Sequence, residues 1–279
     1  MKVGIVGLGF VGNALEKVIN SNVSIIKIDP KLDTSVRDLE NQECNILFIS
    51  VPTPMDEGGG QDLKIVTKVL NEIEKYSTDS LVVMKSTILP DKIDGLSKDF
   101  PSFVYNPEFL RERHAFEDLK NSPFFIFGGD KKNSKKLANF YKLHTSCEAT
   151  DFNYTDVKTA SFVKYAINSF LATKVVFFNE LRNVYINSES EGSWDDFVQL
   201  ISKDIRIGSS HMNVPGPDGR FGFGGACFPK DTSALARYAK NLNAHMELLE
   251  KAISLNNDLR SAYNDTTKRE KEQNINYKK

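Results

Sequence analysis

The sequence has few of the residues whose clusters define a disulfide scaffold or a metal centre. Its 279 residues include three cysteines, four histidines and one tryptophan. Cys44, Cys147 and Cys227 are odd in number and have no paired spacing, which argues against a disulfide framework and favours a reducing compartment. The histidines lack metal-ligand spacing. We therefore predict a cytoplasmic protein without a metal site.

The sequence also lacks an excess of charge and long apolar runs. Its 36 lysines and arginines nearly balance 37 acidic residues, so the formal net charge is −1 at pH 7 and no overall field would attract nucleic acid or an anionic membrane. No apolar run approaches the roughly 20 residues of a membrane span. The opening MKVGIVGLGFVG is interrupted by glycines, which fits a buried strand and turn better than a signal peptide. We predict a globular chain of one or two domains with no nucleic-acid or membrane partner.

The first half of the chain alternates short apolar runs with polar stretches of helical spacing. The apolar runs predict buried strands at Lys2–Val6, Val23–Ile28, Asn45–Val51, Leu81–Lys85, Phe103–Tyr105 and Phe124–Phe127. The stretches between them predict helices at Val11–Asn20, Asp62–Lys75 and Lys132–Leu143. Such alternation predicts an α/β fold of the Rossmann type, a doubly wound parallel sheet over residues 1–152.

The pattern changes near Asp151. From Asp156 to about Asn187 there is no glycine or proline, which predicts one helix of roughly 30 residues. Because this helix is apolar on most sides, it must be covered on most sides, and we expect a second copy of the chain to help in a homodimer. Shorter helices are predicted at Trp194–Lys203, Lys230–Asn241 and Ala244–Ala262. We predict an all-helical dimerisation domain over residues 153–262 and a disordered polar tail over 263–279.

A glycine-rich turn follows the first predicted strand and opens the first predicted helix. Gly7 suits the tight turn, Gly9 lets a pyrophosphate approach the backbone, and Gly12 permits close packing of helix on strand. Asp29 ends the second strand, where a carboxylate binds a ribose 2′-hydroxyl and repels a 2′-phosphate. The prediction is a dinucleotide site that prefers NAD to NADP. The alternative, a glycine turn without a ligand, does not account for the matching strand, helix and acid.

Two pairs of polar residues and one arginine are further candidates. Glu108 and Glu112 are four apart, so a helical turn would place both carboxylates on one face, either in the ligand crevice or as a solvated helix start. Lys164 and Asn168 have the same spacing within an apolar helix and need partners there. They would bond either within a dimer core or to a substrate oxygen. Arg206 is either a surface cation or a phosphate clamp.

The segment GFGGACFPKD at 222–231 combines glycines with a cysteine and charged residues. Its glycines permit close approach of the backbone to a ligand, and Pro229 suits the first turn of a helix. Cys227 therefore lies at or just before a helix N-terminus and near Lys230, a setting that favours the thiolate. Asp231 follows on the same face. We predict a nucleophilic role for Cys227, whereas Cys44 and Cys147 lie in or beside apolar strands and are predicted to be inert.

Taken together, the motifs resemble the nucleotide-sugar dehydrogenases, the UDP-glucose and GDP-mannose 6-dehydrogenase family. The resemblance covers residues 1 to about 260, and its last motif is the most specific. Such enzymes oxidise a sugar C6 alcohol to a carboxylate with two NAD molecules. The matching stretches are GLGFVG at 7–12, VPTP at 51–54, KST at 85–87, NPEFLRE at 106–112, KYAINSFLATK at 164–174, DIRIG at 204–208 and GFGGACFPKD at 222–231.

The resemblance implies a catalytic role for several residues. Cys227 would attack the intermediate aldehyde to give a thiohemiacetal, which a second hydride transfer converts to a thioester. Lys164 with Asn168 would stabilise the oxyanion, and Asp231 would help to position water or the base. Glu112 would be the general base in thioester hydrolysis. The resemblance also assigns Glu108 and Thr87 to ordering water and sugar, and Arg206 to the sugar nucleotide of the neighbouring subunit.

The resemblance also implies two sets of binding residues. The NAD set is Gly7, Gly9, Phe10, Val11, Gly12, Asp29, Val51, Pro52, Thr53, Ser86, Thr87 and Glu112. The nucleotide-sugar set is Phe109, Leu110, Arg111, Lys164, Asn168, Arg206, Phe221, Gly222, Gly224 and Gly225. The expected substrate is UDP-glucose, oxidised to UDP-glucuronate.

In one respect the sequence departs from the family. Typical members continue into a further Rossmann-like domain that holds the nucleotide, whereas this chain stops soon after the helix that ends near Ala262. We expect either fewer nucleotide contacts or a partner chain that completes the site. The segment His211–Arg220 is a candidate for replacement contacts.

Two other functions compete with this one. A single-step β-hydroxyacid dehydrogenase resembles the chain in its Rossmann domain and Lys-x-x-x-Asn helix, but it needs no cysteine, so GFGGACFPKD weighs against it. A non-catalytic NAD-binding remnant or sensor would need none of Cys227, Lys164, Glu112 and Asp231.

Overall fold

The computed structural model describes residues 1–76 and 79–278. These form two compact units. The first consists of Met1–Thr53 and Asp62–Lys164, and the second of Pro54–Gln61 and Tyr165–Lys279. The division falls within the long helix, after Lys164, whereas the sequence predicted a boundary at residue 152.

The first unit is built on a seven-stranded sheet of order β2-β1-β3-β4-β5-β6-β7. The strands are β1 Lys2–Val6, β2 Ser24–Ile28, β3 Ile46–Ile49, β4 Leu81–Met84, β5 Phe103–Tyr105, β6 Phe124–Gly129 and β7 Asp151–Thr155. All six predicted strands are confirmed to within a few residues. The seventh, β7, is an edge strand with no buried residue, so its sequence DFNYT lacks the apolar run that marks the others.

One strand pair differs from the predicted parallel arrangement. Strands β1 to β5 pair parallel with their neighbours, but β6 runs antiparallel to β5, and β7 is again parallel to β6. The connection from β5 to β6 holds only the 3-10 turn η3 (Glu112–His114) and the six-residue helix α4 (Ala115–Lys120). The helix in this connection has only six residues, about half the usual length of a helix, whereas parallel neighbours are usually joined by a longer crossover helix. The sheet is therefore mostly parallel.

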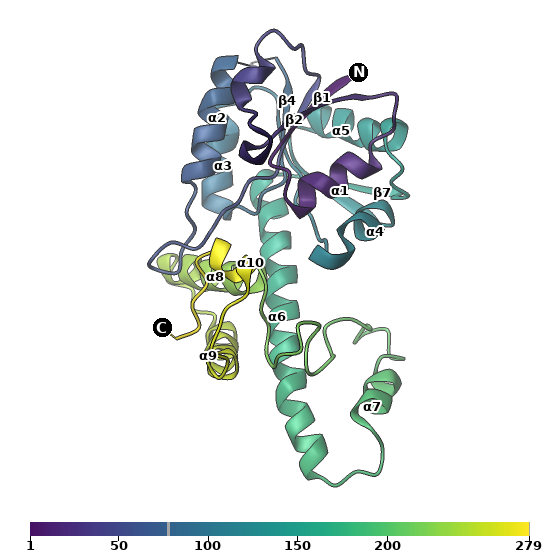
Figure 1. Ribbon diagram of the computed structural model, residues 1–279, viewed down its shortest axis with the longest axis vertical. Coiled ribbons are helices and arrows are strands. Elements are labelled where there is room, and N and C mark those ends of the chain that lie inside the picture. Colours follow the sequence, from purple (N-terminus) through teal and green to yellow (C-terminus); the bar gives the residue numbers. More distant parts are fainter. Residues whose placement is uncertain (77–78, 279) are drawn as a thin grey trace. The chain divides into compact units, whose positions relative to one another are not determined.

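Helices cover both faces of this sheet (Figure 1). On one face α1 (Phe10–Val18), α4 and α5 (Lys131–His144) pack on apolar side chains of β1, β3 and β4. On the other lie α2 (Lys64–Tyr76), α3 (Pro90–Lys98) and the first turns of α6. The predicted helices α1, α2 and α5 are confirmed, and the short α3 and α4 were missed. This arrangement is a Rossmann-like doubly wound fold.

The second unit is helical. The single helix α6 spans Val157–Asn187, 31 residues, which confirms the predicted long helix. In this unit Ala172 and Val176 of α6 pack with Phe223 and Ala252, and farther along Phe178 packs with Trp194. The remaining helices are α7 Trp194–Ile201, α8 Phe228–Asn241, α9 Glu247–Ser261 and α10 Lys268–Glu272. Within the described parts of the chain, no helix has the length and apolarity needed to cross a membrane.

Residues 263–278 do not form the disordered tail that their polar composition predicted. They include helix α10, whose first turn has a capping box between Thr267 and Glu270. Ile275 and Tyr277 are buried, and the Glu270 carboxylate is fully enclosed. Composition was misleading here because a few buried anchors, rather than a continuous apolar run, hold the segment in place.

Candidate active site

The glycine-rich turn after β1 has the backbone geometry that a dinucleotide needs. Gly7 has φ +89°, a left-handed conformation that side chains disfavour, and its carbonyl accepts a hydrogen bond from Ser50 Oγ at 2.7 Å. A side chain at Gly12 would collide with the Gly7 carbonyl, so helix and strand pack closely there. A Cβ at Gly9 would meet no atom within 4 Å. The turn thus leaves open space at the glycine that faces a pyrophosphate in this motif.

Asp29, the predicted ribose ligand, is buried at the end of β2 and tied to the same turn. One carboxylate oxygen accepts the backbone N–H of Leu8 at 2.7 Å, and the other accepts that of Lys31 at 2.9 Å. Each oxygen keeps a further lone pair for a hydroxyl. Phe10 and Val11 open α1 and are half-buried. The carboxylate therefore fixes the glycine turn as well as carrying acceptor capacity for a ribose.

The motifs VPTP and KST meet at the carboxyl ends of neighbouring strands β3 and β4. Thr53 Oγ1 donates to the backbone oxygen of Thr87 at 3.1 Å, and Ser86 Oγ donates to that of Val51 at 2.7 Å. These four residues are buried, whereas Pro52 is exposed. The two predicted cofactor-binding segments thus form one hydrogen-bonded edge, where ligands bind in open α/β sheets.

Lys85, which follows β4, is a candidate functional residue that sequence reasoning missed. Its ammonium group is buried and donates to Asn106 Oδ1 at 2.9 Å and to the Asn106 backbone oxygen at 3.2 Å. Tyr141 donates to the same Asn106 Oδ1 at 2.9 Å. Burial lowers the pKa of Lys85 to about 8, although the negative charge of Glu108 raises it in part. Perturbed lysines of this kind are enriched at functional sites. The available signal was a lysine directly after an apolar strand.

Glu108 and Lys164 form a buried ion pair. Lys164 Nζ lies 3.1 Å from Glu108 Oε1 and also donates to the Glu108 backbone oxygen, and the two side chains are 3% and 5% exposed. Glu108 Oε2 accepts the N–H of Leu110 at 2.7 Å, and the ammonium lies 5.4 Å from the ring centre of Phe109. The predicted catalytic lysine is therefore held by a carboxylate, a carbonyl and an aromatic face.

Glu112 does not share a helical face with Glu108, as its spacing had predicted. Residues 106–111 are not helical, and Glu112 is exposed at the start of η3 while Glu108 is buried. Pro107 and the hydrogen bond to Leu110 keep the intervening chain out of a helical turn. Arg111 is exposed, and its guanidinium forms a two-point contact with Asp118 at 2.7 and 3.0 Å.

In the second unit, a glycine-rich stretch, residues 222–225, precedes Cys227. Gly222 has φ +76° and Gly225 has φ +79°. Asn179 Oδ1 accepts the N–H of Gly222 at 3.0 Å, and a Cβ on Gly224 would overlap the guanidinium of Arg260. Cys227 is the N-cap residue of α8 and is half-buried, as predicted from the following proline. The thiol thus lies at the positive end of a helix.

Asp231, one turn into α8, is almost fully buried and joins two predicted residues. Its Oδ2 accepts the amide of Asn168 at 2.6 Å, and its Oδ1 accepts Lys230 Nζ. Its backbone N–H donates to the Cys227 carbonyl at 2.9 Å. Asn168 is therefore paired with Asp231 within the second unit, and Lys164 is paired with Glu108 within the first.

The remaining candidates lie in more open positions. Arg206 is exposed and its guanidinium binds Asp204 at 2.6 Å. Phe221 is exposed, and its N–H donates to the Tyr263 hydroxyl at 2.9 Å. Burial raises the pKa of the Cys44 and Cys147 thiols, in agreement with their predicted inertness.

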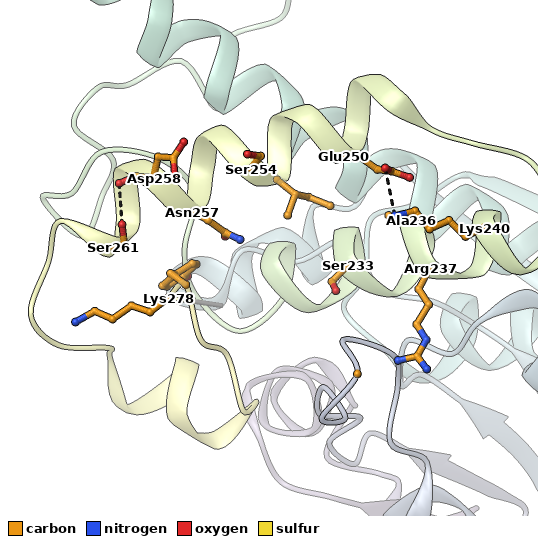
Figure 2. Close-up of a pocket in the computed structure, with 13 residues that line it drawn as sticks. Ser233, Ala236, Arg237, Lys240, Glu250, Ser254, Asn257, Asp258, Ser261 and Lys278 are labelled. Atoms are coloured by element: carbon orange, nitrogen blue, oxygen red, sulfur yellow. Dashed lines mark hydrogen bonds and ion pairs between the residues drawn. The ribbon is translucent and has the colours of Figure 1, made fainter.

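A separate cavity of about 950 Å³ lies between α8 and α9 (Figure 2). Two of its cations are paired with carboxylates: Lys240 Nζ lies 3.3 Å from Glu250, and Arg237 lies 3.3 Å from Asp56. Tyr277 and Lys278 also line it. The cavity has a polar lining, but the residues of the chemical motifs lie elsewhere.

Two family models match the chain in the order of its two units. The model for the NAD binding domain of the UDP-glucose/GDP-mannose dehydrogenase family matches residues 31–146, and that for the central domain matches residues 158–258. The match confirms the resemblance and the NAD prediction. A UDP-glucose 6-dehydrogenase from Rickettsia felis is 32% identical over 278 residues, covering 89% of this chain and 60% of the relative. UDP-glucose 6-dehydrogenase YwqF from Bacillus subtilis is 34% identical, covering 77% of this chain and 49% of the relative.

Solved structures show the same fold. A UDP-glucose dehydrogenase from Pyrobaculum islandicum has a TM-score of 0.68 at 25% identity, over 91% of this chain and 67% of that one. A GDP-mannose dehydrogenase from Pseudomonas aeruginosa has a TM-score of 0.63 at 24% identity, over 95% of this chain and 72% of that one. The chain spans about three fifths of the length of the Rickettsia relatives that it matches. It belongs to the UDP-glucose/GDP-mannose dehydrogenase family.

Proposed function

We propose that the protein is an NAD-dependent dehydrogenase that oxidises the C6 alcohol of a nucleotide sugar, in the first place UDP-glucose, to the uronate. The observation that carries this proposal is Cys227 at the N-cap of α8, behind a glycine-rich approach and one turn before the buried Asp231. A simple alcohol dehydrogenase has no need of a thiol in this setting. Oxidation of an aldehyde to an acid does need a covalent or hydrated adduct.

The residues of the first unit fit the cofactor. The open face of Gly9 would receive the pyrophosphate, Asp29 the ribose, and the edge formed by Thr53 and Thr87 the remainder of NAD. When bound, NAD supplies the hydride acceptor for both oxidations. The protein supplies orientation and a polar environment for the reacting carbon.

The proposed chemistry balances over two oxidations and one hydrolysis. The alcohol first loses a hydride and a proton and becomes an aldehyde. The Cys227 thiol then adds to the aldehyde, with a new bond from sulfur to carbon and the thiol proton passing to the oxygen. The resulting thiohemiacetal loses a second hydride and its hydroxyl proton to become a thioester. Water then breaks the carbon–sulfur bond, which releases the carboxylate and a proton and returns the thiol. One sugar therefore consumes two NAD and one water and yields two NADH.

Lys164, Asn168 and Asp231 have chemical properties suited to the charged stages of this reaction. An ammonium and an amide both donate hydrogen bonds, so they stabilise an oxyanion on the sugar carbon. Asp231 orients the Asn168 amide through the 2.6 Å hydrogen bond. Glu112 is exposed and so can exchange protons with solvent as the base for hydrolysis.

Counting the NADH formed per sugar tests the proposed function. The purified protein is mixed with limiting UDP-glucose and excess NAD, and the final absorbance at 340 nm is compared with the sugar consumed. We expect two NADH per sugar. One per sugar would mean that oxidation stops at the aldehyde, as in a single-step β-hydroxyacid dehydrogenase. No NADH with either UDP-glucose or GDP-mannose would favour the non-catalytic NAD-binding protein, or a site that a partner chain must complete.

We also propose that two copies of the chain pair along α6. Phe170, Phe177 and Val184 are spaced seven residues apart, so they form one stripe, and they are 67%, 55% and 65% exposed. An apolar stripe of this kind on a helix is typical of an interface. Arg206 would then be available to the substrate of the second copy, as in the role that the family resemblance implies.

The substitution Phe177→Glu is expected to convert a dimer into a monomer, because a carboxylate would have to be buried against the partner helix. Light scattering after size exclusion would report the change from about twice 31.4 kDa to the single-chain mass. Leu143→Glu is the matched control, since Leu143 is 68% exposed at the end of α5. A monomeric wild-type protein would contradict the pairing.

A further inference from the structure

Residues 264–278, here named the return segment, fold back onto two loops of the second unit. The Gln273 carbonyl accepts the N–H of Met55 at 3.1 Å, and Asn274 donates to the Met55 carbonyl at 3.1 Å. Arg220 donates to the Asp265 carbonyl at 2.8 Å. The segment is thus joined by hydrogen bonds to the loop after the VPTP motif and to the stretch that leads to Cys227.

The strongest of these attachments is the carboxylate of Glu270. Its Oε1 accepts hydrogen bonds from Arg260 Nη2 at 2.9 Å, the Tyr277 hydroxyl at 2.7 Å and the backbone N–H of Gly225 at 3.2 Å. Its Oε2 accepts the N–H of Thr267 at 2.7 Å. Burial alone would raise the pKa of Glu270, but hydrogen bonds from Thr267 and Tyr277 and the charge of Arg260 lower it to about 2. Glu270 is therefore ionised at neutral pH.

The hydrogen bond from Gly225 to Glu270 lies in the glycine-rich stretch just before Cys227, where the backbone has few other restraints. Gly225 precedes Cys227 by two residues, has a left-handed φ of +79°, and a Cβ there would meet nothing within 4 Å. Glycine in open space has the widest choice of conformation. The Phe223 N–H donates to Asn256 at 2.6 Å. Two glycines, Gly224 and Gly225, follow before α8 begins. Among the described residues, only the Gly225 N–H of this pair has a hydrogen bond, and its acceptor is the Glu270 carboxylate.

We propose that Glu270 is a positioning residue for Cys227: by binding the Gly225 N–H it holds the thiol at the N-terminus of α8. This inference rests on the proposed role of Cys227 as nucleophile. The role of Glu270 is indirect, since its contacts are with the loop and with Arg260 rather than with the sulfur. Loss of the carboxylate would free Gly225 and let Cys227 leave the N-cap position, where the helix favours the thiolate.

The test is the rate at which iodoacetamide alkylates Cys227 in the full chain, followed by peptide mass spectrometry between pH 6 and 10. Glu270→Gln keeps the shape of the side chain but removes its charge, so the oxygen that faces the Gly225 N–H becomes a weaker acceptor, and an amide nitrogen is placed against the Thr267 N–H. We expect alkylation about tenfold slower at pH 7, with its pH midpoint raised by about one unit. Slower alkylation is expected only if Glu270 positions the cysteine. A purely electrostatic effect would have the opposite sign, because removing a nearby negative charge favours the thiolate and makes alkylation faster.

Glu272→Gln is the matched control. It removes a carboxylate from the same helix, where Glu272 pairs with Arg269 at 2.6 Å, and should leave the alkylation rate unchanged. Tyr277→Phe removes one donor to Glu270 Oε1 and is expected to slow alkylation about twofold to threefold, a readout that remains if Glu270→Gln does not fold. Alkylation at the wild-type rate or faster in a folded Glu270→Gln protein, or in Tyr277→Phe if the former is unfolded, would overturn the proposal.

The alkylation assay needs no sugar and no NAD. Failure of the proposed oxidation would leave the alkylation rates interpretable, and failure of the positioning role would leave the NADH stoichiometry unchanged for the wild-type protein. In an active enzyme, Glu270→Gln should lower kcat with little change in KM, since the thiol acts after the sugar has bound.

Discussion

Replacing Cys227 with alanine is expected to reduce uronate formation by about a thousandfold or more, since no other group would form the covalent adduct. The first oxidation should persist, because removing a hydride from the alcohol needs no thiol. The product should therefore be an aldehyde, which semicarbazide would trap and mass spectrometry would identify. The measurement is NADH per sugar with the trap present, expected to fall from two to one.

The other two cysteines serve as controls for this substitution. Cys44 is buried and Cys147 half-buried, and burial raises the pKa of both thiols, so Cys44→Ala and Cys147→Ala should retain two NADH per sugar. A thermal melt of Cys227→Ala would check that the second unit is still folded. Uronate production by Cys227→Ala at the wild-type rate would remove the thioester from the mechanism.

Removing one partner of the Glu108–Lys164 pair should produce the largest loss of stability. Lys164→Met would leave a buried carboxylate without its cation, which typically costs about 3–5 kcal/mol in the free energy of unfolding. Glu108→Leu would strand the ammonium, so a loss of similar size is expected. Urea denaturation followed by circular dichroism would measure both. The paired variant Glu108→Leu/Lys164→Met should lose less than the sum, because both charges leave together.

An exposed ion pair provides the control for this result. Lys120 lies 3.8 Å from Glu148 with side chains 41% and 65% exposed, and Lys120→Met should leave the denaturation midpoint nearly unchanged. Additive losses in the paired variant would show that the two charges do not interact. Activity separates the catalytic role from the structural one: Lys164→Arg keeps the charge but changes its geometry, so we expect a lower kcat at nearly wild-type stability.

Much of the fold could be predicted because its elements are long or strongly patterned. Strands β1 to β6 are short apolar runs, and α6 has neither glycine nor proline over 31 residues. Edge strand β7 and the short helices α3 and α4 were missed because exposed or brief elements carry little periodic signal. The direction of β6 depends on how the chain returns from β5, which spacing alone does not reveal.

The candidate site was predictable where a motif carries its own context. Cys227 precedes a proline at a helix start, and Gly7, Gly9 and Gly12 follow a strand, so their local structure followed from neighbouring residues. The Glu108–Lys164 pair joins residues 56 positions apart, and the bonds between Lys85 and Asn106 join residues 21 apart. Such long-range pairs depend on the tertiary fold, and no local spacing encodes them.

The interleaving of the two units has a practical consequence for dissecting the protein. Residues 54–61 belong to the second unit although about a hundred residues of the first unit follow them before Tyr165. Gly59 accepts the Ser233 hydroxyl at 2.8 Å, and Met55 anchors Gln273, so a fragment beginning at Tyr165 would lack part of its own scaffold. During synthesis this loop leaves the ribosome well before its helical partners exist. The second unit can therefore fold completely only after its C-terminal helices have been synthesised. To express this unit alone with all its residues, residues 54–61 would have to be joined to it, either by circular permutation or by grafting the loop.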